Sequence, residues 1–152
     1  MQTVAIVLRE YLIDLRREAR KNTDFHRVLY SGKHIQLSVI SLKPGEEIGE
    51  ETHDRTDQYF RFEAGEGTIV IEGAEERVGE GVGVIIPAGI RHNVINTSKR
   101  AHLKLYTILS PPARHNGIVR HIKNRYTTEK HRFPEPLMKG IRKAHLSSQQ
   151  KT

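Results

Sequence analysis

The chain has 152 residues, a length typical of one domain, and its content of 36% hydrophobic and 28% charged residues is that of a folded protein. It has no cysteine, which excludes disulfides, thiolate zinc sites, iron–sulfur clusters and cysteine nucleophiles. No apolar run approaches the roughly 20 residues of a membrane helix, and residues 1–7 lack the build of a signal peptide. We therefore expect a cytoplasmic protein with no membrane partner.

The net charge of +7 is concentrated near the C-terminus. Residues 1–110 carry 15 Lys and Arg against 16 Asp and Glu, whereas residues 111–152 carry 10 against 2. A basic extension suggests nucleic acid or an anionic surface as a partner. This one has no recognisable nucleic-acid motif and no interleaved aromatic residues. A solvated or partner-docked extension is the simpler interpretation, so nucleic acid is not an expected partner.

Residues 1–24 are predicted to form an N-terminal helical arm. Apolar residues recur at near-helical spacing between Thr3 and Lys21. Within this stretch, residues 14–21 are the strongest helix candidate, and Asn22 closes it.

From residue 25 the pattern changes to short segments rich in Val, Ile, Tyr, Phe or Thr, separated by turn signals such as Pro44-Gly45. The predicted strands are residues 28–30, 34–42, 48–50, 58–63, 68–72, 83–86, 92–96 and 102–109. Short strands at this spacing indicate a β sandwich or barrel. We predict an all-β domain over residues 25–112. A basic C-terminal extension follows over residues 113–152, in which residues 137–146 could form a short helix.

Four polar residues have the spacing of a metal site. Glu51 and His53 are two residues apart, so on a strand they point to the same face. Gln58 follows across a turn, and His92 follows a Pro-x-Gly turn. If the strands pair, two imidazoles and two side-chain oxygens converge, which suits a divalent metal ion. Asp57 is the rival carboxylate, but by alternation it lies on the opposite strand face.

The spacing of these residues resembles that of the cupin superfamily, in particular its small single-domain members. In the second motif, residues 81–96, the chain matches the family pattern at every position where that pattern fixes the residue type: Gly81, Pro87, Gly89, His92 and Asn96. The first motif, residues 45–65, fits at Gly45, His53 and Gly65. It departs from the common pattern at two positions, with Glu51 in place of a histidine and Gln58 in place of a glutamate.

The resemblance implies a single cupin jelly-roll barrel that holds one divalent metal ion near its axis. The implied ligands are Glu51, His53, Gln58 and His92, and Gln58 could instead hydrogen-bond a water or His53. Zinc, manganese, iron and nickel all accept such ligands, so the identity of the metal stays open. The resemblance also implies pairing of barrels through their sheets, and we expect a homodimer.

Further residues are candidates for a binding pocket or for catalysis. The pocket candidates are Gln36, Ser38, Phe60 and Phe62. The first two share one face of a predicted strand, which could line a pocket or face solvent, and the two phenylalanines are predicted to be pocket-wall or core residues. Tyr106 is a candidate proton donor, with packing in the sheet as the alternative. Glu51, if it does not bind metal, is a candidate acid or base.

Three functions stay open at this point, because cupins host many activities. The first is a metal-dependent enzyme, of the isomerase or oxygenase type, that acts on a small polar or sugar-like molecule. An isomerase would use the metal as a Lewis acid, and an oxygenase would use Fe(II) held by two histidines and a carboxylate. The second is a non-catalytic module that binds a small molecule. The third is a barrel that has lost its metal.

Overall fold

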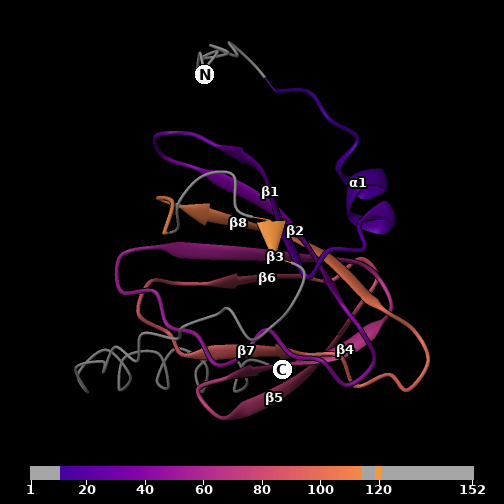
Figure 1. The fold of residues 1–152 in the computed structure, drawn as a ribbon. Helices are drawn as coiled ribbons and strands as arrows, with labels where there is room; N and C mark the ends of the chain where they lie inside the picture. The colour runs from indigo at the N-terminus through magenta and orange to yellow at the C-terminus, as the bar shows by residue number, and fades with distance from the viewer. Residues whose placement is uncertain (1–10, 114–118, 121–152) are drawn as a thin grey trace, which may run out of the picture.

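The computed structural model describes residues 11–113 and 119–120, which form one helix and two antiparallel sheets (Figure 1). The elements are α1 (Leu15–Lys21), β1 (His26–Ser31), β2 (Gln36–Leu42), β3 (Asp57–Ala64), β4 (Glu66–Ile71), β5 (Ala74–Gly79), β6 (Gly83–Ile86), β7 (His92–Ile95), β8 (Leu103–Ser110) and β9 (Val119–Arg120). The all-β architecture predicted from the sequence is confirmed.

The two sheets form the walls of a barrel. The larger sheet has the strand order β6-β3-β8-β2-β1-β9, and the smaller has the order β5-β4-β7. In Figure 1 the larger sheet forms the upper wall and the smaller sheet the lower wall. Their inward faces share one apolar core, at whose centre Phe60 and Phe62 are fully buried with ring centroids 6.4 Å apart.

Strand alternation decides which side chains enter the barrel. On β3, Gln58, Phe60 and Phe62 are buried, while Tyr59 and Arg61 between them are partly exposed. A β-strand points successive side chains to opposite faces, so the first three share the inner face. The same alternation on β8 turns Leu105, Thr107 and Leu109 inward, and Tyr106 outward.

The helix predicted at residues 14–21 is confirmed as α1. It packs on the outer face of the larger sheet. It begins at Leu15 and is capped by Asp14, whose side chain accepts a hydrogen bond from the backbone amide of Arg17. Ala19 is fully buried against the sheet. Arg16 and Arg20 both pair with Glu80, at 2.8 and 2.6 Å. Among the described residues, no helix is long and apolar enough to cross a membrane.

Three details of the strand prediction were wrong. Residues 48–50 are not a strand; instead Glu47 and Glu51 each form an isolated bridge to β7. The strand β5 was not predicted, because most of its side chains are exposed and it lacks apolar alternation. The strand β9 was not predicted either, and it pairs with β1.

The predicted helix at residues 137–146 and most of the basic extension lie outside the described residues. The division of the chain into an N-terminal arm, a β domain and a basic extension, with boundaries at residues 24 and 112, stays a prediction.

One motif glycine is required by close packing. Gly65, in the turn between β3 and β4, has a φ of +86°, and a Cβ added there would lie 2.3 Å from the carbonyl oxygen of His102. No other residue type fits both the left-handed backbone and this approach.

We expect Phe62→Ala to lower the free energy of unfolding by about 3–5 kcal/mol, because it opens a cavity in the centre of the core. Urea denaturation followed by circular dichroism measures this. Leu12→Ala, at a side chain that is 100% exposed, is the control and should change stability by at most about 0.5 kcal/mol. Equal effects of the two substitutions would contradict the placement of Phe62.

Candidate metal centre

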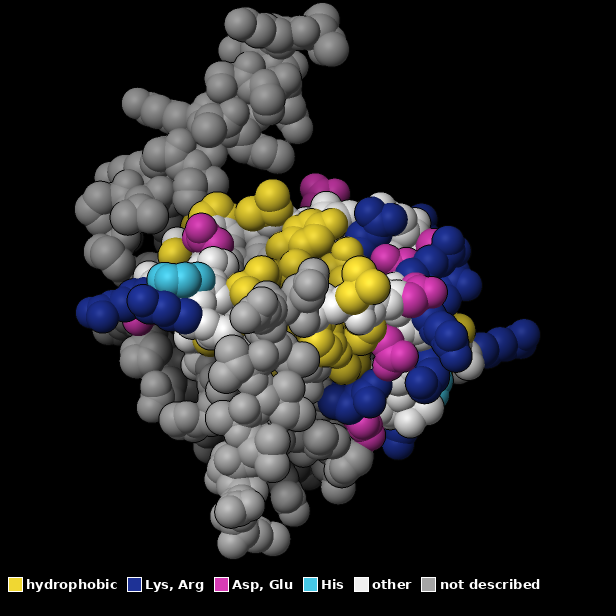
Figure 2. Space-filling model, turned by 90° about the horizontal axis from the view of Figure 1, so that it is seen from above, with side chains coloured by type: hydrophobic (Ala, Val, Ile, Leu, Met, Phe, Trp, Pro, Cys, Tyr) yellow, Lys and Arg dark blue, Asp and Glu magenta, His cyan; other side chains and the backbone are white. Residues whose placement is uncertain are grey.

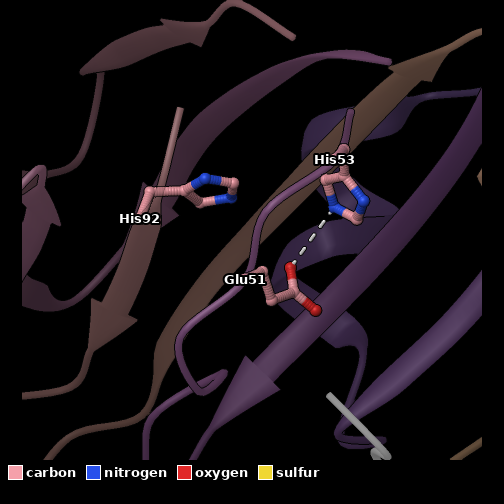
Figure 3. Close-up of side chains that lie close together, drawn as sticks. All are labelled: Glu51, His53 and His92. Carbon is pink, nitrogen blue, oxygen red and sulfur yellow. Dashed lines mark ion pairs between the residues drawn. The ribbon is translucent and has the colours of Figure 1, made fainter. Parts of the chain in front are cut away.

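Glu51, His53 and His92 form a compact group inside the barrel (Figure 3). One potential ligand atom from each residue lies within 4.8 Å of the other two. Glu51 and His92 are buried, and the His53 side chain is 12% exposed. Glu51 and His53 come from the connection between β2 and β3, and His92 begins β7.

Backbone hydrogen bonds bring these distant parts of the chain together. The amide of Glu51 donates to the carbonyl of His92 at 2.8 Å, and the amide of His92 donates to the carbonyl of Glu51 at 2.9 Å. The amide of Gly89 donates to the carbonyl of His53 at 2.8 Å. The Pro-x-Gly turn therefore positions His53 as well as His92.

Hydrogen bonds also orient the His92 ring. Its Nδ1 lies 2.9 Å from the carbonyl oxygen of Ile90, which can only accept, so Nδ1 carries a proton. Its Nε2 lies 2.9 Å from Oε1 of Gln58, whose Nε2 donates to Thr107 Oγ1 at 2.9 Å. Burial lowers the pKa of His92, outweighing the Ile90 hydrogen bond and the Glu51 carboxylate, which raise it.

A neutral His92 that is protonated at Nδ1 presents a lone pair at Nε2 to the oxygen of the Gln58 amide. Two acceptors then face each other at 2.9 Å. A cation bound by both atoms satisfies them, as does a half-turn of the amide in metal-free protein. Gln58 is thus placed to contribute an oxygen beside His92.

The surroundings of the His53 Nε2 atom indicate whether the group of Glu51, His53 and His92 fits a metal ion. It is buried and has no hydrogen-bond partner, and it lies 3.6 Å from Oε2 of Glu51. Ligand bonds of about 2.1 Å in a tetrahedral site hold the ligand atoms about 3.4 Å apart. Two imidazoles, a carboxylate and an amide oxygen suit divalent zinc, manganese, iron or nickel. These residues fit such an ion.

The remaining candidates divide between the two faces of the larger sheet. Asp57 is exposed, and its Oδ1 accepts a hydrogen bond from the backbone of Ala88 at 2.7 Å, so it supports the turn before His92. Tyr106 faces outward, where its ring meets that of Tyr59 at 6.2 Å in an edge-on arrangement. The structure does not bring Tyr106 to the group of Glu51, His53 and His92.

The pocket candidates all lie inside the barrel. Gln36 and Ser38 are buried on β2, as Phe60 and Phe62 are on β3. The Phe60 and His92 rings meet in an edge-type arrangement, with centroids 5.6 Å apart. Thr107, which holds the Gln58 amide, was not among the predicted residues. The sequence feature that could have identified it is its position on β8, midway between two leucines that point inward.

Comparisons with known proteins agree with this architecture. A family model described as "Cupin domain" matches residues 38–109. The crystal structure of BH2720 from Bacillus halodurans is 35% identical, covers 78% of this chain and 94% of that protein, and has a TM-score of 0.74. The uncharacterized protein L612 of Acanthamoeba polyphaga mimivirus is 41% identical over 105 residues, which are 66% of this chain and 65% of that protein.

A shorter similarity extends to a larger protein. A mannose-1-phosphate guanylyltransferase of Salmonella montevideo is 34% identical over 70 residues, which are 46% of this chain and 15% of the transferase. The chain spans less than two thirds of the length of the curated relatives that it matches.

We expect Gln58→Leu to weaken the binding of Zn²⁺ by about 10- to 100-fold, because it removes the amide oxygen beside His92 without changing the volume much. Competition with a chromophoric chelator measures the affinity. Tyr59→Phe, on the outer face of the same strand, is the control and should keep the affinity of the unmodified protein. Unchanged affinity in Gln58→Leu would show that its oxygen is not a ligand.

Proposed function

Because this chain belongs to the cupin superfamily, we propose that its barrel holds one divalent metal ion and acts as a metal-dependent enzyme on a small polar or sugar-like molecule. The observation that carries the proposal is the group of Glu51, His53 and His92, with ligand atoms within 4.8 Å of one another. The buried Nε2 of His53, which has no hydrogen-bond partner and lies 3.6 Å from Oε2 of Glu51, supports it.

The residues of the chain have distinct roles in this proposal. Glu51, His53 and His92 hold the ion, and Gln58 adds an amide oxygen. A bound divalent ion supplies Lewis-acid polarisation of a substrate oxygen or, if it is iron, chemistry with O₂. The carbonyl of Ile90 fixes the proton of His92 at Nδ1. The Phe60 ring packs against the His92 imidazole in an edge-type arrangement, with ring centroids 5.6 Å apart.

The substrate class is drawn from two observations. The buried side chains that connect to His92 through hydrogen bonds, Gln58 and Thr107, are neutral and polar, which suits hydroxyl and carbonyl groups. The partial similarity to a mannose-1-phosphate guanylyltransferase supports a sugar-like molecule. Isomerase and oxygenase chemistry differ in the metal that they use, so the identity of the metal decides between them.

A second candidate function, a non-catalytic module that binds a small molecule, is favoured by one observation. Among the described residues, the two buried side chains that connect to His92 through hydrogen bonds, Gln58 and Thr107, are not ionisable acids or bases in the working range of pH. Tyr106 faces away from the barrel. Proton transfer would therefore fall to Glu51 itself, in competition with its role as a ligand.

We further propose a homodimer that buries the outer face of the larger sheet. Register places five apolar side chains in one row across this face, from β1 to β6: Tyr30, Leu37, Ile108, Tyr59 and Ile85. Ile85 is 71% exposed. Figure 2, viewed from above the larger sheet, shows apolar side chains gathered on this side. A second copy of the chain would cover such a surface.

We expect about one equivalent of a divalent metal per chain and its loss in His92→Ala, which removes a ligand. Mass spectrometry on protein purified without an affinity tag measures both. His34→Ala, at an exposed histidine, is the matched control and should keep the metal. Iron would favour the oxygenase type, and zinc or manganese the isomerase type. Metal-free protein, even after reconstitution, would overturn the proposal.

We expect Ile85→Glu to raise the dissociation constant of the dimer by about tenfold or more, because a carboxylate would enter an apolar contact. Light scattering over a micromolar concentration series measures this. Ala74→Glu, at an exposed position of β5 in the other sheet, is the control and should leave the dimer intact. A monomeric unmodified protein would refute the dimer.

A further inference from the structure

Two polar side chains of β2 point into the barrel, and each has one polar atom without a hydrogen-bond partner. Gln36 is 0% exposed and Ser38 is 1% exposed. The Nε2 of Gln36 and the Oγ of Ser38 have no hydrogen-bond partner, although the Oε1 of Gln36 accepts from Ser31 at 3.4 Å. Burying a donor without a partner costs stability. Such a cost is expected where a ligand supplies the missing partner.

These two side chains continue the polar contacts of the candidate metal centre across the sheet. Ser38 lies directly opposite Thr107, and Gln36 lies opposite Leu109, which in turn lies opposite Gln58. Gln58 connects Thr107 to His92 through its amide. Since neighbouring strands are about 4.8 Å apart, the unpaired atoms on β2 lie roughly 10 Å from β3, on the same inner face.

The charges of the side chains around β2 indicate which class of ligand this part of the barrel can bind. Among the described residues, the buried polar side chains include no Lys or Arg. A carboxylate or phosphate at this end of the barrel would therefore lack a Lys or Arg partner. The Ser38 hydroxyl both donates and accepts, and the Gln36 amide donates. The matching groups are uncharged hydroxyl and carbonyl oxygens. The rings and methyl groups of Phe60 and Leu109 on the same face suit the C–H surface of a sugar.

We propose that Gln36 and Ser38 form the distal end of the ligand site, where they bind hydroxyl oxygens of an uncharged, polyhydroxylated molecule such as a free sugar or polyol. The proximal end of the site rests on the proposed function, since it is the group of Glu51, His53 and His92. The distal end selects neutral ligands over their phosphorylated or carboxylated counterparts.

The test uses the full chain, both reconstituted with Zn²⁺ and metal-free. The neutral probes are D-mannose, D-glucose and sorbitol, and the anionic ones are mannose 6-phosphate and glucuronate. Saturation-transfer NMR titrations measure their affinities. We expect a neutral probe to bind more tightly than its anionic counterpart. Ser38→Ala and Gln36→Leu should each weaken that probe about tenfold. Ser41→Ala, an equally buried serine on the outer face of β2, should leave binding unchanged.

Thermal unfolding without probes separates a ligand-binding hydroxyl from a structural one. We expect Ser38→Ala to keep or raise the melting temperature, because it removes an unpaired polar group. Ser41→Ala should lower it, because Ser41 Oγ lies 3.1 Å from His102 Nδ1. A lower melting temperature in Ser38→Ala together with unchanged probe binding would overturn the inference.

Metal content, measured on the same samples, distinguishes the two proposals. If the protein holds metal but binds no neutral probe, the distal site is refuted and the metal proposal stands. If it takes up no metal but binds a neutral probe in a Ser38-dependent way, the metal proposal is refuted and the distal site stands. Preference for the anionic probes would refute the neutral ligand class.

Discussion

The arrangement of the barrel interior depends on the pair of backbone hydrogen bonds that joins Glu51 to His92. The connection between β2 and β3 is long and forms no regular strand. It runs along β7 all the same, because the amides of Gly45 and Ile48 donate to the carbonyls of Asn96 and Val94. These bonds place a carboxylate and two imidazoles from separate segments of the chain within reach of one ion.

Much of this could be predicted from strand alternation. Gln58, Phe60 and Phe62 were expected on one face of a strand, and all three are buried on the inner face of β3. The spacing of Glu51 and His53 suggested a common face, although the segment that carries them makes only an isolated bridge. The structure brings both residues to His92 and Gln58, and their role as metal ligands stays a prediction.

The sequence was less informative where both faces of a strand have similar polarity. On β8, Leu105 and Thr107 alternate with Tyr106 and Ile108, so composition cannot say which pair faces inward. The pairing with β3 and β2 settles this, and it turns Tyr106 outward. The inward direction of Gln36 and Ser38 was left open for the same reason. The strand β5 escaped prediction because its exposed charged residues resemble a loop.

The edge strands β5 and β6 of the two sheets expose different kinds of side chain. The outer edge of the smaller sheet is β5, where Glu75, Glu76 and Arg77 are exposed. Charged side chains on an edge strand oppose the addition of a strand from another molecule. The larger sheet ends at β6, where Ile85 is exposed instead. A strand from another molecule would therefore meet charged side chains at β5 but an exposed apolar side chain at β6.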